Sequence, residues 1–166
     1  MRKGFTLIEL FMAVVILGII SVGSFIAIYS FRGQNLQAAA ERVAADLRFA
    51  RGLALSGNKW IGVAFFIEPA NSYFLYETDG TTDTALKDPT DPGKNYQINL
   101  ANDYEQVLLT SVVAGGVSKI EFSPLGVPYL DKSGSSLGSV AVITLSNGNS
   151  QTTVQVEPET GRVVKP

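Results

Sequence analysis

A single carboxylate, Glu9, stands at the start of a long apolar segment near the N-terminus. Residues 10–31 contain no charged side chain. As a helix rising about 1.5 Å per residue they would span roughly 33 Å, close to the hydrocarbon thickness of a bilayer. A carboxylate at such a place costs free energy in lipid unless a cation neutralises it. We therefore expect residues 10–31 to anchor the chain in a membrane and Glu9 to pair with a cation.

Two commoner kinds of segment explain this region less well. A secretory signal peptide would begin with basic residues such as Arg2 and Lys3, but its apolar run is usually shorter and ends at a small-residue cleavage site, which is missing here. An ordinary single-pass anchor accounts for the apolar run and leaves Glu9 and the junction of Gly4 and Phe5 without a role. In an anchor, Arg2 and Lys3 would stay on the cytoplasmic side and the rest of the chain would face outward.

The junction itself resembles a known class of processing site. The resemblance rests on six consecutive residues ahead of the apolar run: Gly4, Phe5, Thr6, Leu7, Ile8 and Glu9. This order is similar to the class III signal of type IV pilins and type II secretion pseudopilins. The resemblance implies that a prepilin peptidase cleaves between Gly4 and Phe5 and N-methylates Phe5. It further implies that Glu9 pairs with the α-amino group of Phe5 on a neighbouring subunit, since that amine is a cation at neutral pH.

The chain contains no cysteine and no histidine. Ser-His-Asp and Cys-His catalysis are therefore impossible, and a zinc site would have to be built from carboxylates alone. No disulfide framework can form, so an exported domain would depend on packing for its stability. With 166 residues, of which 46% are hydrophobic and 17% charged, the chain has room for one anchor and one modest core. We therefore expect that the protein is not an enzyme and holds no cofactor.

Charge is distributed unevenly along the chain. Residues 1–60 hold seven Lys and Arg against three Asp and Glu, a net charge of +4, whereas residues 61–166 hold six against twelve, a net charge of −6. Removal of residues 1–4 would take away Arg2 and Lys3 and change the net charge of the chain from −2 to −4. The C-terminal part is therefore acidic, which disfavours binding of phosphate groups.

After residue 31 the apolar pattern narrows to a stripe at the spacing of an amphipathic helix. The stripe consists of Leu36, Ala40, Val43, Leu47, Ala50 and Ala54, with Glu41, Arg42, Asp46, Arg48 and Arg51 between its members. No proline precedes Pro69, so nothing forces a break, and residues 56–58 provide a stop. We predict one helix over about residues 5–55, with the stripe from Val43 to Ala54 facing the domain that follows.

From Trp60 onward the pattern changes to the alternation of β-strands. Strands are predicted over residues 60–67, 72–78, 96–100, 106–113, 118–122, 139–145, 152–157 and 162–164. Asn147 and Gly148 predict a two-residue hairpin turn, and residues 159–161 predict another turn. Both faces of segment 60–67 are apolar, so this strand should be covered twice, on one side by the helix. The pattern predicts an α+β fold, with a long N-terminal helix packed on an antiparallel β-sheet domain.

Three segments sharpen the resemblance to one group of pilins. In chain order they are residues 38–51, residues 122–126 (Phe-Ser-Pro-Leu-Gly) and residues 160–163 (Thr-Gly-Arg-Val). Together they resemble the GspH/FimT group of minor pilins and minor pseudopilins. The resemblance implies a pilin-like fold with a leader peptide (1–4), a transmembrane and filament-core helix (5–31), its amphipathic continuation (32–57) and an antiparallel β head domain (58–166).

The same resemblance implies a function. It predicts a structural subunit of the tip or initiation complex of a type II secretion pseudopilus or a type IV pilus. The implied partners are other pilins or pseudopilins of the filament, the prepilin peptidase, an inner-membrane assembly platform and membrane lipid. The implied location is the bacterial inner membrane, crossed once, with the head in the periplasm or at the filament tip.

Three further candidate sites lie in the head. Asp79, Asp83, Asp88 and Asp91 could bind calcium, although a solvated loop rich in turn residues explains them better. Arg162 and Lys165 resemble the Gly-Arg-x-Arg element of DNA-uptake minor pilins of the FimT kind, and DNA binding or adhesion is the alternative function. Val164 stands where the second arginine should be, and Lys165 is displaced by one position. An aromatic set is expected in the core and not on a ligand platform: Trp60, Phe65, Phe66, Tyr73, Phe74 and Tyr76.

Overall fold

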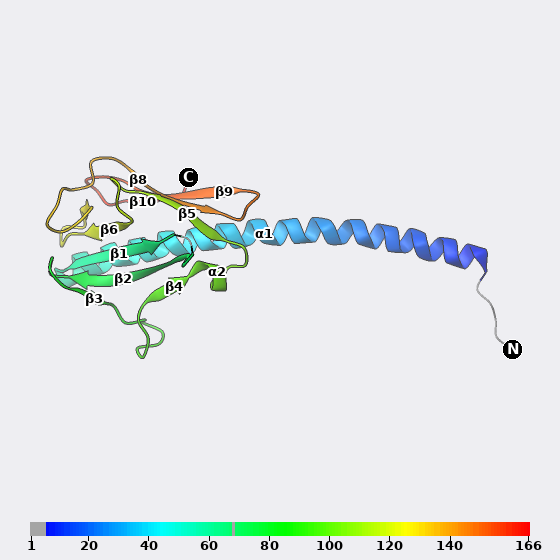
Figure 1. Ribbon diagram of the computed structural model, residues 1–166, viewed down its shortest axis with the longest axis horizontal. Helices are drawn as coiled ribbons and strands as arrows, with labels where there is room; N and C mark the ends of the chain where they lie inside the picture. Colours follow the sequence, from blue (N-terminus) through cyan, green and yellow to red (C-terminus); the bar gives the residue numbers. More distant parts are fainter. Residues whose placement is uncertain (1–5, 68) are drawn as a thin grey trace.

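The computed structural model describes residues 6–67 and 69–166, with the backbone alone for residues 22–32. A long helix, α1 (Leu7–Gly57), extends its N-terminal half away from a β-domain and lies against that domain with its C-terminal half (Figure 1). Asn58 ends the helix in a left-handed conformation at φ 51°, and its N–H donates to the Ala54 oxygen. The predicted helix stop at residues 56–58 is confirmed.

The predicted membrane segment, residues 10–31, falls in part on residues 22–31, whose side chains lie outside the description. In the described part of the chain, no helix combines the length and the apolar character needed to cross a bilayer.

The β-domain consists of two antiparallel sheets. In the first sheet the strand order is β3-β2-β1-β6-β7. Strand β4 pairs with the same edge of β2 as β3 does, β4 with residues 72–74 and β3 with residues 76–78. Its strands are β1 (Trp60–Phe66), β2 (Ser72–Thr78), β3 (Asp83–Ala85), β4 (Gln97–Asn99), β6 (Lys119–Phe122) and β7 (Pro128–Tyr129). The second sheet has the order β10-β9-β8-β5. Its strands are β5 (Leu108–Val113), β8 (Ala141–Ser146), β9 (Gln151–Val156) and β10 (Val163–Val164), and a short helix, α2 (Leu100–Asp103), precedes β5.

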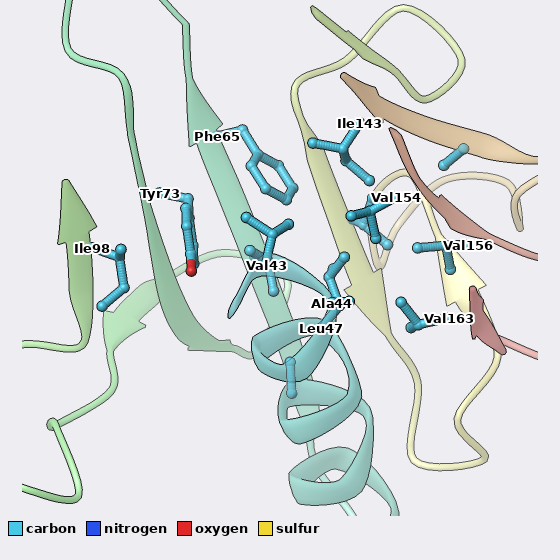
Figure 2. Packing of buried hydrophobic residues seen from close by; sticks show 14 of the residues in the cluster. Val43, Ala44, Leu47, Phe65, Tyr73, Ile98, Ile143, Val154, Val156 and Val163 are labelled. Atoms are coloured by element: carbon cyan, nitrogen blue, oxygen red, sulfur yellow. The ribbon is translucent and has the colours of Figure 1, made fainter. Parts of the chain in front are cut away.

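The core fills the space between the two sheets and α1. Figure 2 shows the helix between them, with Val43, Ala44 and Leu47 directed at apolar side chains of both. The predicted stripe is buried as expected, because Val43, Leu47, Ala50 and Ala54 are each 0% exposed. The helix therefore joins the sheets into one domain, and the predicted α+β architecture is confirmed.

The outer face of β1 is not covered by a second layer, which corrects the expectation of cover on both faces. Gly62 is buried because the Tyr76 ring lies directly over it, and a Cβ atom at this position would overlap the ring. Farther along the strand, Phe66 is 46% exposed and stacks on the half-buried Phe74 at a ring distance of 5.7 Å. The prediction of a core aromatic set therefore holds for residues such as Tyr76 and is wrong for Phe66.

The predicted two-residue turn at Asn147 and Gly148 is also wrong. The hairpin forms, but Ser146 pairs with Gln151, so the loop comprises residues 147–150. The Asn147 side chain accepts hydrogen bonds from the N–H groups of Asn149 and Ser150 at 3.1 and 2.9 Å, and such an Asn cap favours the wider loop. The elements β3, β7 and α2 escape prediction because each is too short to establish a period.

Candidate functional site

The N-terminus of α1 is closed by a capping box between Thr6 and Glu9. The Glu9 N–H donates to Thr6 Oγ1 at 3.3 Å, and Glu9 Oε2 accepts from both the N–H and the hydroxyl of Thr6 at 2.9 Å. This arrangement satisfies backbone donors that the first helical turn leaves without partners. Within the chain, the Glu9 carboxylate therefore already has a structural role. The predicted cleavage site at Gly4 and Phe5 lies outside the described residues, and the pairing of Glu9 with Phe5 stays a prediction.

From Leu7 to Ile20, α1 exposes apolar side chains on all sides. Between Leu7 and Ile20 the exposed fractions of the large apolar residues range from 42% for Val15 to 86% for Leu7. Monomeric soluble proteins rarely expose so large a continuous apolar surface, so this part of the helix requires cover by lipid or by other chains.

The structure brings together the three segments that carry the GspH/FimT resemblance. From α1, Arg51 Nε donates to the Gly126 oxygen and Arg48 Nη2 donates to the Val163 oxygen, both at 3.2 Å. Gly126 and Gly161 both have positive φ, 74° and 64°, and a Cβ atom on Gly161 would overlap the Gly126 oxygen. The Phe-Ser-Pro-Leu-Gly turn and the Thr-Gly-Arg turn thus meet against one face of the helix.

The Asp46 carboxylate lies in the core, although the sequence pattern placed it among the polar side chains of the helix. Asp46 is 4% exposed and accepts hydrogen bonds from the hydroxyls of Tyr73 (2.6 Å) and Tyr96 (2.8 Å) and from Arg42 Nε (3.0 Å). Its spacing of seven, three and four residues from Ala39, Val43 and Ala50 puts Asp46 on the buried face of the helix. The sequence pattern could have revealed this position, but a charged residue is normally expected to be exposed. Burial, together with the hydrogen bond to Asp46, raises the pKa of Tyr96 to about 12.

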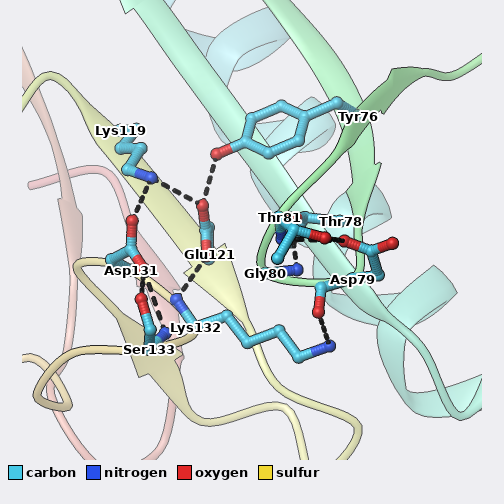
Figure 3. Close-up of polar contacts among 10 residues, drawn as sticks. All are labelled: Tyr76, Thr78, Asp79, Gly80, Thr81, Lys119, Glu121, Asp131, Lys132 and Ser133. Carbon is cyan, nitrogen blue, oxygen red and sulfur yellow. Dashed lines mark hydrogen bonds and ion pairs between the residues drawn. The ribbon is translucent and has the colours of Figure 1, made fainter.

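A second buried carboxylate, Glu121, joins the first sheet to the loop that follows β7 (Figure 3). It is 1% exposed and accepts from Tyr76 Oη (2.7 Å), Lys119 Nζ (2.9 Å) and the Lys132 N–H (2.6 Å). Lys119 Nζ also contacts Asp131 Oδ2 at 2.5 Å, and this bond, the largest cause, holds the pKa of Asp131 well below its usual range. These contacts give the Glu121 carboxylate its hydrogen-bond partners, and no buried side-chain polar atom of the described residues lacks one. The role of Glu121 is therefore structural.

The four aspartates of the proposed calcium loop do not converge. Asp79 accepts from the N–H groups of Thr81 and Thr82 at 2.8 and 2.7 Å, and these bonds, with the Thr81 hydroxyl, lower the pKa of Asp79 to about 2. Asp88 and Asp91 likewise cap their own turns. Asp83 lies on β3, exposed. Among the described residues no three acidic side chains are grouped so as to hold a metal ion.

The two cations of the DNA-binding alternative lie beside acids. Lys165 Nζ pairs with Glu41 Oε1 at 2.8 Å and donates to Gln37 Oε1 at 3.1 Å. Arg162 Nη1 lies 3.8 Å from Glu157 Oε1. Both charges are at least partly compensated within the chain, so nothing in this arrangement favours the nucleic-acid alternative.

Comparison with known proteins gives two sequence matches and several structural ones. Residues 1–25 match the prokaryotic N-terminal methylation motif, and residues 39–161 match the family described as type II transport protein GspH. The type IV minor pilin FimU of Pseudomonas aeruginosa (strain PAO1) is 15% identical, with a TM-score of 0.57 over 80% of this chain and 89% of FimU. The minor pseudopilin EpsH of the type 2 secretion system of Vibrio cholerae is 12% identical, with a TM-score of 0.59 over 80% of this chain and 96% of EpsH. No curated protein sequence matched the chain.

Proposed function

The chain belongs to the GspH family of type II transport proteins, and on that premise we propose that it serves in the tip or initiation complex of a type II secretion pseudopilus or a type IV pilus. Membership makes it a minor pilin-type structural subunit and not an enzyme. A pilin-type subunit assembles with other pilins in a filament and is held at the membrane through its N-terminus, to which the methylation motif corresponds. The exposed apolar surface of α1 from Leu7 to Ile20 is the observation that carries this role, because only lipid or neighbouring helices can cover it.

We further propose how the chain is divided between membrane and filament. Residues 1–4 are a leader removed by a prepilin peptidase. Residues 5–31 cross the bacterial inner membrane once and later enter the filament core, and residues 32–57 continue this helix into the head domain, residues 58–166. An inner-membrane assembly platform transfers the subunit from lipid into the filament. The methylation motif at residues 1–25 supports this division.

Processing is the first prediction of this proposal. We expect the mature chain to begin with N-methylated Phe5, because a small residue precedes the cleavage point and an apolar one follows it. The measurement is the intact mass of protein purified from its native host, together with the mass of its N-terminal peptide. Retention of residues 1–4, or cleavage after the apolar segment, would contradict a pilin-type anchor.

The second prediction separates two roles of Glu9. If its charge neutralises the amine of Phe5 on a neighbour, Glu9→Gln and Glu9→Leu should both weaken assembly by about 3–5 kcal/mol, the typical cost of removing one partner of a buried ion pair. Insertion, processing and the fold of the head should stay unchanged. The measurement is co-purification of the full chain with its partner pilins from detergent extracts of the native host.

The capping box supplies the matched control. Gln can still accept from Thr6 at this position of the helix, so Glu9→Gln removes the charge and keeps the cap. Thr6→Val removes the cap and keeps the charge. Normal assembly of Glu9→Gln beside impaired assembly of Thr6→Val would mean that Glu9 acts only as a helix cap, and the pairing proposal would then be wrong.

A further inference from the structure

Two exposed leucines belong to segments that meet at the end of α1 farthest from the N-terminus. Leu125, in the Phe-Ser-Pro-Leu-Gly turn, is 81% exposed, and Leu55, in the last turns of the helix, is 46% exposed. The turn lies against this part of the helix, because a Cβ atom built on Gly126 would be 3.1 Å from Leu55 Cδ2 and 3.2 Å from Arg51 Nε. The fold thus leaves one exposed leucine on each of two segments that lie against each other.

The turn that carries Leu125 is fixed by hydrogen bonds. The Gly126 N–H donates to the Ser123 oxygen at 2.7 Å, and the Ser123 N–H donates to the Val127 oxygen at 2.9 Å. Arg51 Nε donates to the Gly126 oxygen at 3.2 Å, which ties the turn to the helix. Because the backbone is already ordered, burial of Leu125 by a partner would cost little conformational entropy.

Two arginines, Arg48 and Arg51, lie about two turns and one turn before Leu55 on α1. Arg48 and Arg51 donate to the backbone oxygens of Val163 and Gly126, and neither forms an ion pair with any described residue. Glu41, two turns before Arg48 on the same helix, pairs with Lys165 at 2.8 Å, and this pairing, with a smaller contribution from the charge of Arg48, lowers the pKa of Glu41. Positive charge is therefore left over here, although residues 61–166 carry a net charge of −6.

We propose that Leu55, Leu125, Arg48 and Arg51, together called the apical surface, dock a neighbouring pilin-type subunit that presents carboxylates around an apolar recess. This inference rests on the proposed function. Guanidinium groups pair most strongly with carboxylates, and aliphatic anchors beside charged groups are the usual anatomy of a protein interface. A nucleic acid fits less well, because phosphate groups would leave both leucines exposed to water.

The test uses the full chain in membranes of its native host. A photoreactive benzoylphenylalanine replaces Leu125, and in a matched control it replaces Val113, an exposed aliphatic residue (60%) on β5. Cross-linked products are identified by mass spectrometry. We expect Leu125, and not Val113, to give a product with a subunit that carries its own N-terminal methylation motif. Arg48→Glu should lower the yield of that product at least tenfold, as should Arg51→Glu.

A second arm guards against misfolding and separates the two proposals. Leu125→Ser changes a side chain that makes no core contact, so it should leave thermal stability unchanged while reducing co-purification of the partner pilin at least threefold. If the Leu125→Ser and Arg48→Glu variants both bind pilins normally while the Glu9→Leu variant does not, the proposal that the apical surface docks a partner is wrong. The proposed filament function would still stand. Cross-links from Leu125 only to nucleic acid, lipid or a protein of another kind also overturn the docking proposal. If no pilin co-purifies with the unmodified chain, both proposals fall.

Discussion

Leu47→Asp should lower the free energy of unfolding by roughly 4–6 kcal/mol. Leu47 is 0% exposed and lies between the two sheets, so the change removes a buried aliphatic side chain and places an unpaired carboxylate in the core (Figure 2). The measurement is urea unfolding of the full chain in detergent micelles, followed by the fluorescence of Trp60. Trp60 is the sole tryptophan and packs edge-on against Tyr129 at 5.0 Å, so it reports on the first sheet.

Two variants control for the chemistry of the substitution. Ala45→Asp introduces the same carboxylate two positions away on the exposed face and should cost less than about 1 kcal/mol, mostly through helix propensity. Leu47→Ala creates space without a charge and should cost about 2–4 kcal/mol. Wild-type stability of Leu47→Asp, or equal losses for the two aspartate variants, would show that the helix does not pack between the sheets.

Asp46→Ala should destabilise the head by about 2–4 kcal/mol. The buried Tyr73 hydroxyl would lose its acceptor at 2.6 Å, Tyr96 would lose its acceptor at 2.8 Å, and Arg42 would lose its ion pair at 3.0 Å. The expected loss of stability is smaller than for a fully buried ion pair, because the Arg42 side chain is 41% exposed and retains contact with water. Asp83→Ala, at an exposed aspartate on β3, is the control and should change stability by less than about 0.5 kcal/mol.

Alkaline pH tests the same network without a mutation. The pKa of Tyr96 is raised from 10.0 to about 12, chiefly by burial and then by the hydrogen bond to Asp46. Tyr96 therefore ionises at lower pH in the unfolded chain than in the folded one. Its contribution to the free energy of unfolding is complete below pH 10 and is lost as the pH rises toward 12. In Asp46→Asn the carboxylate charge is gone, so the ultraviolet absorbance of ionised tyrosine should appear at lower pH. An unchanged titration would mean that Asp46 does not interact with Tyr96.

Local pattern was enough to predict the main elements. The stripe from Val43 to Ala54 marked the buried face of the helix, and β2 spans Ser72–Thr78, the residues predicted for it. Residues 56–58 marked the helix end, because a helix stop depends on backbone conformations that Gly and Asn adopt readily. The pilin-like fold and the GspH/FimT group were implied by a resemblance carried by short motifs and their order along the chain, and the family match over residues 39–161 confirms the membership.

Contacts between distant residues could not be read in the same way. Asp46 and Glu121 look like surface acids in the sequence, and they are buried because Tyr73, Tyr96 and Tyr76 reach them from other strands. For Asp79, Asp88 and Asp91 the sequence favours a solvated loop over a calcium site, and the structure shows that each of them caps its own turn.

The sequence by itself therefore determined the helix and the alternation of the strands, since both depend on residues that are neighbours along the chain. The order of short motifs along the chain was enough to indicate the family. Only the tertiary structure decided which charged groups are satisfied internally and which are left for a partner. Arg162 and Lys165 lie beside acids, whereas Arg48 and Arg51 donate hydrogen bonds to the backbone oxygens of Val163 and Gly126. The physical reason is that burial and charge pairing depend on distances across the fold, and residue spacing along a strand or helix does not specify those distances.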